Sequence, residues 1–518
     1  MYTIISGYFT SIVIETKQKK IVSIVAAIFT LYGIYNISSS TILFGKKKEL
    51  PDGVKEIPTP SGALPYFGHI FQVPSELPAL KFDEWHKKYG PLIRVKMGVK
   101  SWLIIGDRYH ANNLLKVHGS MTSGRAYHLF LMEYNSMNQK GAVFTNPDKR
   151  WKKSRTVAQG VLGAKAIEKE MSRIESVSAQ TTQLILENTR QHGHVDITKY
   201  MQLNCLNVIM YTCLGISAKA LEDPLFKSVI HSMETTVKLG GARQDIHSFL
   251  PAFTKLFNLL IPNNEKAMHG FVYGFRNPLY RQMIDKALQS DTPCYAKIMY
   301  QIKDDIGLDE DDLLVLMADL INAGSDPTAL TIAWSFVILV HHPNRLPHYD
   351  EREQFPYMLS VQKECIRYKS AKHLAVPREA TEDFVYQGYF IPKGTVISPN
   401  TYTLCQDPAF YDRPDEFVPD RYIDDLSTFS VLVNANIEKR DLYTFGWGRR
   451  MCPGYHLVEV EFFNIWVQIF ATTVIEPPLD TNGNPKYPDL DGYHDVGIIV
   501  APRDKYLRFI ERTDRIVI

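Results

Sequence analysis

The residue best suited to chemistry is Cys452, in the stretch FGWGRRMCPG from Phe445 to Gly454. The glycines of this stretch let the backbone approach a flat group and turn its N–H groups toward the sulfur. The apolar run from Leu457 has helical periodicity, so a helix N-terminus follows the cysteine and stabilises its thiolate. Arg450 adds positive charge and can bind a carboxylate through two hydrogen bonds. These residues predict an anionic sulfur beneath a macrocycle that carries carboxylates.

For a lone cysteine, the simpler interpretation is a buried structural thiol in a glycine-rich turn. The neighbours of this cysteine favour a ligand, because they match F-x-x-G-x-R-x-C-x-G at Phe445, Gly448, Arg450, Cys452 and Gly454. The stretch resembles the haem-binding loop of the cytochrome P-450 family. The resemblance implies that Cys452 is the proximal ligand of the iron in haem b (iron protoporphyrin IX), and that Phe445 and Arg450 contact the haem.

Three further residues resemble the propionate contacts of the same family. Trp151 and Arg155, in WKKSR, are four residues apart and project from one helix face. Taken alone, they also fit an amphipathic surface helix with a solvated basic side. Arg378 follows Pro377 at an expected strand position. The resemblance implies that Trp151, Arg155, Arg378 and Arg450 hold the two haem propionates.

The segment from Asp309 to Pro343 predicts a helix of about 30 residues, or about 45 Å. It is apolar on nearly all sides, which is typical of a helix through the centre of a domain. Its middle reads AGSDPT, where Pro327 removes one backbone hydrogen bond. The ordinary interpretation is a proline kink with Asp326 paired to a distant Arg or Lys.

This motif also resembles a family motif, A-G-x-D-T-T/S, which lies over the oxygen-binding face of haem. Ala323, Gly324 and Asp326 match it, whereas Pro327 occupies the usual threonine position and Thr328 follows. The resemblance implies that Ala323 and Gly324 contact the cofactor, and that Asp326 and Thr328 are catalytic residues of the distal proton path. Because of Pro327, the alcohol lies one position further along the helix.

A second group of charged residues is structural by the same resemblance. Glu364 and Arg367, in KECIR, would be worth little as an isolated surface salt bridge. In the family, E-x-x-R joins a downstream P-x-x-F-x-P-x-R motif, which here ends at Arg421. The resemblance implies that Glu364, Arg367 and Arg421 form a buried lock behind the cysteine loop. After Pro343 the helix that usually precedes E-x-x-R is mostly missing, which reflects either the protein itself or an imperfect gene model.

The composition is that of an ordinary globular protein, with 518 residues, 45% hydrophobic and 22% charged. A net charge of +2 gives no field suited to nucleic acid, so we expect no such partner. Six scattered cysteines without a C-x-x-C pair argue against a disulfide framework or a zinc site, and for a reducing compartment.

The N-terminal part predicts a membrane anchor. After an N-terminal segment, residues 1–20, residues 21–45 carry no charge and are flanked by lysines, which predicts one transmembrane helix. A cleaved signal peptide fits less well, because the span starts late and lacks a small-residue cleavage site. Residues 46–68 are a basic, proline-rich hinge, and the resemblance implies that residues 69–518 form a haem-thiolate catalytic domain. The resemblance implies a single-pass protein of the endoplasmic reticulum membrane with a cytosolic catalytic domain.

The expected fold class is mainly α with a smaller β part (α+β), and the resemblance implies a cytochrome P-450 fold. Long helices are expected over residues 164–302, with β-hairpins over residues 91–107, turning at Gly98, and over residues 386–399. The expected substrate-lining segments are mostly apolar, with polar contacts from His128, Lys372 and His494. They are Ser120–Val143, Leu316–Ala323, Ala371–Val376 and Tyr493–Ile498.

The resemblance is to membrane-anchored eukaryotic members, fungal ones among them, and implies a monooxygenase. Such an enzyme inserts one oxygen atom of O2 into a small apolar substrate and receives NADPH-derived electrons through NADPH-cytochrome P-450 reductase, with cytochrome b5 as a further donor. Its other partner is membrane lipid, and the reductase would dock near Arg449 and Arg450. Two alternatives remain: a reductase-independent haem-thiolate isomerase or peroxygenase, and a non-catalytic haem-binding relic.

Overall fold

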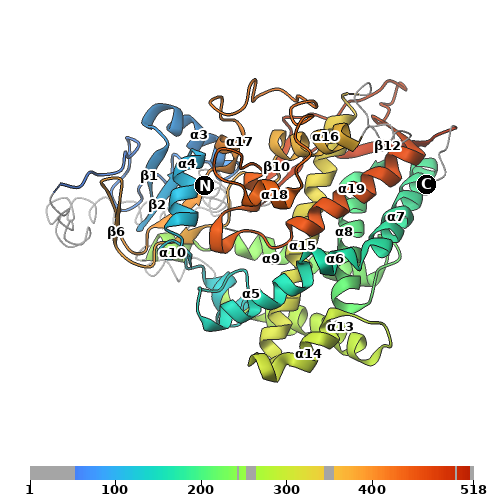
Figure 1. Cartoon of the computed structure of the whole chain (residues 1–518), viewed down its shortest axis with the longest axis horizontal. Helices are drawn as coiled ribbons and strands as arrows, with labels where there is room; N and C mark the ends of the chain where they lie inside the picture. The colour runs from blue at the N-terminus through green and yellow to red at the C-terminus, as the bar shows by residue number, and fades with distance from the viewer. Residues whose placement is uncertain (1–52, 242–243, 252–263, 343–354, 496–498, 514–518) are drawn as a thin grey trace, which may run out of the picture.

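A computed structural model describes residues 53–241, 244–251, 264–342, 355–495 and 499–513 (Figure 1). The predicted fold class is confirmed, because long helices dominate and short strands form a smaller part. The predicted N-terminal segment and transmembrane anchor lie outside these residues, as do the residues directly after His342 where a helix was expected to be missing. None of the helices within the described ranges is both long and apolar enough to cross a membrane.

Most of the longer helices lie in the regions predicted to be helical. Their bounds are α3 Pro78–Tyr89, α5 Lys149–Leu162, α7 Met171–His192, α8 Ile197–Leu214, α9 Pro224–Gly240, α13 Asn277–Gln289, α14 Tyr295–Ile306, α15 Glu310–Leu339, α16 Phe355–Tyr368 and α19 Tyr455–Thr472. The shorter segments are α4 Arg108–Asn112, η1 Asn113–Val117, η2 Leu129–Asn135, α6 Ala164–Glu168, α10 Ile246–Phe249, α12 Glu265–Phe271, η3 Val272–Arg276, α17 Thr401–Cys405, α18 Phe429–Asn434, η6 Tyr443–Phe445 and η7 Gly448–Arg450.

The largest sheet has five strands in the order β1-β2-β8-β5-β3. Their bounds are β1 Leu92–Met97, β2 Lys100–Ile105, β3 Gly124–Arg125, β5 Arg378–Glu379 and β8 Val396–Pro399. The predicted first hairpin is confirmed as β1–β2, with Val95 opposite Trp102. Gly98 turns the hairpin with a φ of +60°, where a Cβ would lie 1.9 Å from the carbonyl oxygen of Phe249.

The second predicted hairpin was wrong in its pairing. β6 (Phe384–Tyr386) pairs with β7 (Tyr389–Ile391), while β8 pairs in parallel with β2 and antiparallel with β5. Residues 392–395, between β7 and β8, therefore connect two sheets. The remaining strands are β4 Val195–Asp196, β9 Thr473–Glu476, β10 Tyr493–Asp495, β11 Val500–Pro502 and β12 Tyr506–Glu511, in sheets ordered β4-β12-β9 and β10-β11.

Helix α15 is the centre of the helical part, as predicted. Figure 1 shows it running through the middle of the molecule, with β1 and β2 at the left and α7, α8 and α19 toward the right. Asp309 and Asp312 form a capping box at its start, which satisfies two backbone N–H groups. Most of its residues are buried, including Trp334 and Phe336, and Ser335 accepts a hydrogen bond from Trp466 of α19 at 3.0 Å. Apolar burial thus fixes α15 between α8 and α19.

Candidate functional site

The loop around Cys452 is held by its own backbone. The N–H of Cys452 donates to the carbonyl of Phe445 at 2.8 Å, and the N–H of Gly454 lies 3.4 Å from Cys452 Sγ. Gly448 has a φ of +53°, and a Cβ there would lie 2.4 Å from the carbonyl oxygen of Leu115. The predicted helix follows as α19, so the sulfur sits beside a helix N-terminus with a backbone donor directed at it.

Four arginines gather beside this loop: Arg125, Arg155, Arg378 and Arg450. Arg155 donates to the carbonyl of Met451, next to the cysteine. Arg378 donates to backbone carbonyls of η1 and of the cysteine loop. Arg450 donates to two backbone carbonyls, at 3.0 and 2.6 Å. Neutral carbonyls therefore position these guanidinium groups without neutralising them.

The electrostatics of this cation cluster indicate a site for anions. Burial, followed by repulsion from neighbouring arginines, lowers the pKa of Arg450 to about 8, of Arg378 to about 9 and of Arg125 to about 10; for Arg378 these neighbours include Arg440. Arg450 Nη1 is buried without a hydrogen-bond partner among the described residues. Two carboxylates would supply the missing charge and acceptors, so the donor set fits the propionates of a haem.

Arg125 was missed by the sequence analysis. It belongs to no motif that we used, and its strand β3 joins the site only by pairing with β5, where Arg125 lies opposite Arg378. Only knowledge of this long-range pairing could have indicated it. Trp151, predicted as a propionate contact, donates its Nε1 hydrogen to the carbonyl of Ala142 at 3.1 Å. Its ring lies 4.5 Å from the guanidinium carbon of Arg450 and supports that arginine.

The middle of α15 presents its predicted residues in different directions. Ala323 is exposed although most of the helix around it is buried, so this face of α15 borders open space. A Cβ at Gly324 would lie 3.0 Å from Ile209 of α8, which shows that Gly324 permits close helix packing there. Together with the cation cluster, the open face at Ala323 fits a flat cofactor beside the cysteine loop.

Asp326 and Thr328 are not brought together. Asp326 Oδ1 accepts a hydrogen bond from Gln202 Nε2 at 2.7 Å, and burial raises the pKa of Asp326. The partner is therefore a neutral amide of α8, and not the Arg or Lys that the ordinary interpretation expected. Thr328 is buried, and residues two apart on a helix point to different sides.

The structure brings Glu364, Arg367 and Arg421 into one buried group. Arg367 donates twice to the carboxylate of Glu364, at 2.8 Å each, and Arg421 donates to it at 2.9 Å. Arg367 also donates to the carbonyls of Cys405 and Pro414. The motif thus ties α16 to the segment that leads toward the cysteine loop.

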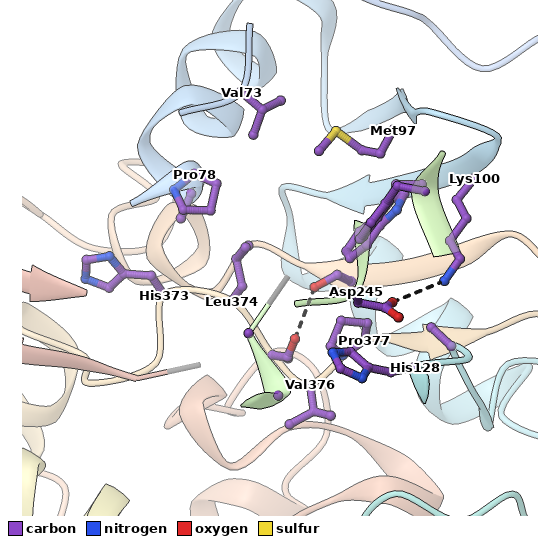
Figure 2. Close-up of a pocket in the computed structure, with 18 of the residues that line it drawn as sticks. Val73, Pro78, Met97, Lys100, His128, Asp245, His373, Leu374, Val376 and Pro377 are labelled. Atoms are coloured by element: carbon purple, nitrogen blue, oxygen red, sulfur yellow. Dashed lines mark hydrogen bonds and ion pairs between the residues drawn. The ribbon is translucent and has the colours of Figure 1, made fainter. Parts of the chain in front are cut away.

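A cavity of about 260 Å³ lies between the five-stranded sheet and α10 (Figure 2). Its walls include parts of three predicted lining segments, at residues 125–132, 373–376 and 495, but no residue of Leu316–Ala323. His128 lines it, whereas Lys372 and His494 do not. The sequence analysis missed the contributions of residues 73–82, 240–241 and 245–249.

The cavity wall is mostly apolar but includes one ion pair. Figure 2 shows Asp245 directed at Lys100, with 3.8 Å between Oδ2 and Nζ. Lys100 also donates to the carbonyl of Tyr127 at 2.7 Å. Lys100 is therefore paired with Asp245 and with a backbone carbonyl. The cavity offers its ligand mainly apolar contact, which suits an apolar molecule.

Comparisons with known proteins agree with this geometry. The sequence profile described as Cytochrome P450 matches residues 58–492. Cytochrome P450 monooxygenase 58 of Postia placenta is 25% identical over 86% of this chain and 86% of its own length. Cytochrome P450 monooxygenase virE of Hypocrea virens is 22% identical, covering 90% and 88%.

Solved structures show the same fold. A zebra fish cytochrome P450 with progesterone has a TM-score of 0.68 at 21% identity, covering 84% of this chain and 99% of that one. Another structure of a zebra fish cytochrome P450, with abiraterone, has a TM-score of 0.66 at 19% identity, covering 84% and 100%. The cysteine loop, the cation cluster and the family profile lead to one conclusion: the chain belongs to the cytochrome P450 family of monooxygenases.

Proposed function

We propose that this protein inserts one oxygen atom of O2 into an apolar organic substrate, using electrons from NADPH delivered through a reductase. The observation that carries the proposal is the position of Cys452, with a backbone N–H 3.4 Å from its sulfur and four arginines nearby that donate to backbone carbonyls. That arrangement suits a haem b whose iron is ligated by the thiolate. When bound, haem supplies oxygen activation at a thiolate-ligated iron.

The protein's own residues would orient the reactants and handle protons. Arg125, Arg155, Arg378 and Arg450 would hold the propionates and so fix the plane of the cofactor. The apolar cavity would bind the substrate and exclude water. Asp326, whose pKa burial raises, would hold a proton on the carboxyl group that Gln202 binds at the α8 side of α15.

The partners and the location belong to the same proposal. Arg449 is exposed beside the cysteine loop, as is Lys439, and both favour an acidic electron donor such as NADPH-cytochrome P-450 reductase, with cytochrome b5 as a second donor. The uncharged residues 21–45 support anchoring in the endoplasmic reticulum membrane.

One observation favours a second candidate, a reductase-independent peroxygenase or isomerase. Pro327 occupies the position of the usual threonine, and Asp326 is held toward α8 by Gln202. Both features weaken a proton path to the distal face. Such an enzyme would turn over with a hydroperoxide and not with NADPH plus reductase.

The test is the carbon monoxide difference spectrum of the reduced full-length protein, compared with Cys452→Ala and with the buried control Cys405→Ala. We expect the red-shifted band of thiolate ligation in the wild type and in Cys405→Ala, and its loss in Cys452→Ala. A thiol-type band or no haem in the wild type would overturn the proposal and favour a relic. If the thiolate band is present, turnover is measured with NADPH plus reductase and, separately, with a hydroperoxide. This comparison distinguishes the monooxygenase from the reductase-independent enzyme.

A further inference from the structure

The carboxylate of Asp319, in α15, binds the backbone of two adjacent residues, Ala142 and Val143. The carbonyl groups of these two residues accept hydrogen bonds from side chains of the haem site. Asp319 Oδ2 accepts hydrogen bonds from the N–H groups of Ala142, at 2.8 Å, and Val143, at 3.0 Å. The carbonyl of Ala142 accepts from Trp151 Nε1 at 3.1 Å, and the carbonyl of Val143 accepts from Arg125 Nε at 2.8 Å. A displacement of this backbone would therefore reach Trp151 and Arg125 together.

We infer that Asp319 is a positioning residue for the cation cluster, acting through the backbone segment 140–146, here called the strap. The inference rests on the proposed function in one respect, namely that the cation cluster holds the haem propionates. Asp319 itself does not belong to any motif used above. It lies one helical turn before Ala323, so the strap joins the central helix at the level of the open face.

The strap contacts the cation cluster at a further point. The carbonyl of Thr145 accepts from Arg450 Nη2 at 2.6 Å. Thr145 Oγ1 in turn donates to the carbonyl of Lys140 at 2.7 Å, which closes the strap on itself. Arg125 and Arg450 thus each donate one guanidinium hydrogen bond to the strap, and the backbone N–H of Arg125 donates to Asn146 Oδ1 at 2.9 Å.

The approach of the strap to α15 depends on a glycine. Gly141 has a φ of +80°, and a Cβ there would lie 2.6 Å from Asp319 Oδ2 and 2.6 Å from a methyl carbon of Val315. Any other residue at position 141 would push the strap away from the carboxylate. The sequence at this position is therefore matched to the contact with Asp319.

The charge of Asp319 is retained at a cost to stability. The side chain is buried, and burial raises its pKa to about 6, although the two N–H groups, Arg276 of η3 and Arg125 of β3 act in the opposite direction. A single amide oxygen could accept both hydrogen bonds without that cost. Residues kept at the expense of stability are typical of functional sites.

The experiment measures haem dissociation from the purified full-length protein into an excess of a haem acceptor, and the reduction potential of the haem iron. We expect Asp319→Ala to lose haem about 10- to 100-fold faster than the wild type, the range found when an outer partner of a cofactor ligand is removed. Its potential should fall, because loosened arginines neutralise the propionates less. Asp319→Asn should retain haem nearly as the wild type does, since its oxygen still accepts both bonds.

The matched control is Ser335→Ala, a buried position of the same helix that contacts α19 and not the strap. It should lower stability without changing haem loss or the potential. Should Asp319→Ala not fold, Gly141→Ala displaces the same contact while leaving every polar group in place, and should give the same faster loss. If Asp319→Ala or, should that variant not fold, Gly141→Ala loses haem at the wild-type rate, the inference is overturned. A wild type that binds no haem would instead overturn the proposed function.

Discussion

Gln202 holds Asp326 on the α8 side of the central helix through a hydrogen bond of 2.7 Å. The carboxyl group is buried, and its pKa is raised by that burial. The amide of Gln202 is the donor that compensates part of this cost, so the two residues are coupled in stability and in the position of the proton.

We predict opposite results for the two partners. Gln202→Leu should lower the free energy of unfolding by about 1–3 kcal/mol, because it leaves a buried acceptor unpaired. Asp326→Asn should leave stability unchanged or raise it, because its oxygen still accepts from Gln202 and an amide has no charged form to bury. Equilibrium urea unfolding measures both, and a loss of similar size in Asp326→Asn would contradict the coupling.

Asp326→Asn also tests the proton path. If Asp326 supplies protons at the distal face, Asp326→Asn should release more hydrogen peroxide per NADPH consumed than the wild type, at unchanged substrate binding. If the hydrogen peroxide yield does not change, the residue serves the packing of α15 on α8 and not catalysis.

Local sequence signals predicted much of this molecule. The capping residues and apolar length of α15, the glycines of the cysteine loop and the alternation of β1 and β2 each act within a short stretch of chain. Pairings between distant segments could not be read in this way. β8 joins β2 across nearly 300 residues, and Arg125 reaches the site only because β3 pairs with β5. The hydrogen bonds between Asp319 and the strap also join segments that are far apart in the sequence, so no local pattern predicted them.

The Glu364 group should respond unequally to loss of its two arginines. Arg367 is 1% exposed and donates to three backbone carbonyls, whereas Arg421 is 11% exposed and donates to two. Arg367→Leu should cost about 3–5 kcal/mol, since it leaves a buried charge with less compensation. Arg421→Leu should cost less, because Arg367 still binds both carboxylate oxygens. Urea unfolding of the two variants decides this, and equal losses would contradict it.

The dependence of stability on pH should reveal Asp319. Its pKa is about 6 in the folded protein and about 3.9 in an unfolded chain. The folded carboxyl holds its proton more tightly, so its contribution favours folding below about pH 4 and is lost as the pH rises through 6. The shift corresponds to about 3 kcal/mol.

Asp319→Asn lacks this titration, so its stability relative to the wild type should increase by about 2.4 kcal/mol between pH 4 and pH 8. The measurement is urea unfolding of both proteins at several pH values. A difference that does not vary with pH would mean that the carboxyl group is not buried as the structure has it.

Loss of one arginine from the cation cluster should raise the stability of the haem-free protein and weaken its binding of haem. Arg378 and Arg450 are buried, and repulsion from neighbouring arginines adds to burial in lowering the pKa of Arg450. Replacing one such charge by an apolar side chain removes repulsion, and exchanges of this kind have stabilised proteins by about 1–4 kcal/mol. Arg450→Met should therefore raise the melting temperature of the haem-free protein.

The same variant should bind haem more weakly, by about tenfold or more, because a charge-assisted bond to a propionate is lost. Arg440→Met is the control: Arg440 is also buried, but it donates to the carbonyls of Val433 and Gly446 and stacks on Trp447. Its loss should lower the melting temperature of the haem-free protein. Arg450→Met could instead destabilise the haem-free protein as much as Arg440→Met does. The hydrogen bonds of Arg450 to the carbonyls of Ser123 and Thr145 would then outweigh the repulsion. In that case the main role of the cluster would be structural, and not the binding of an anion.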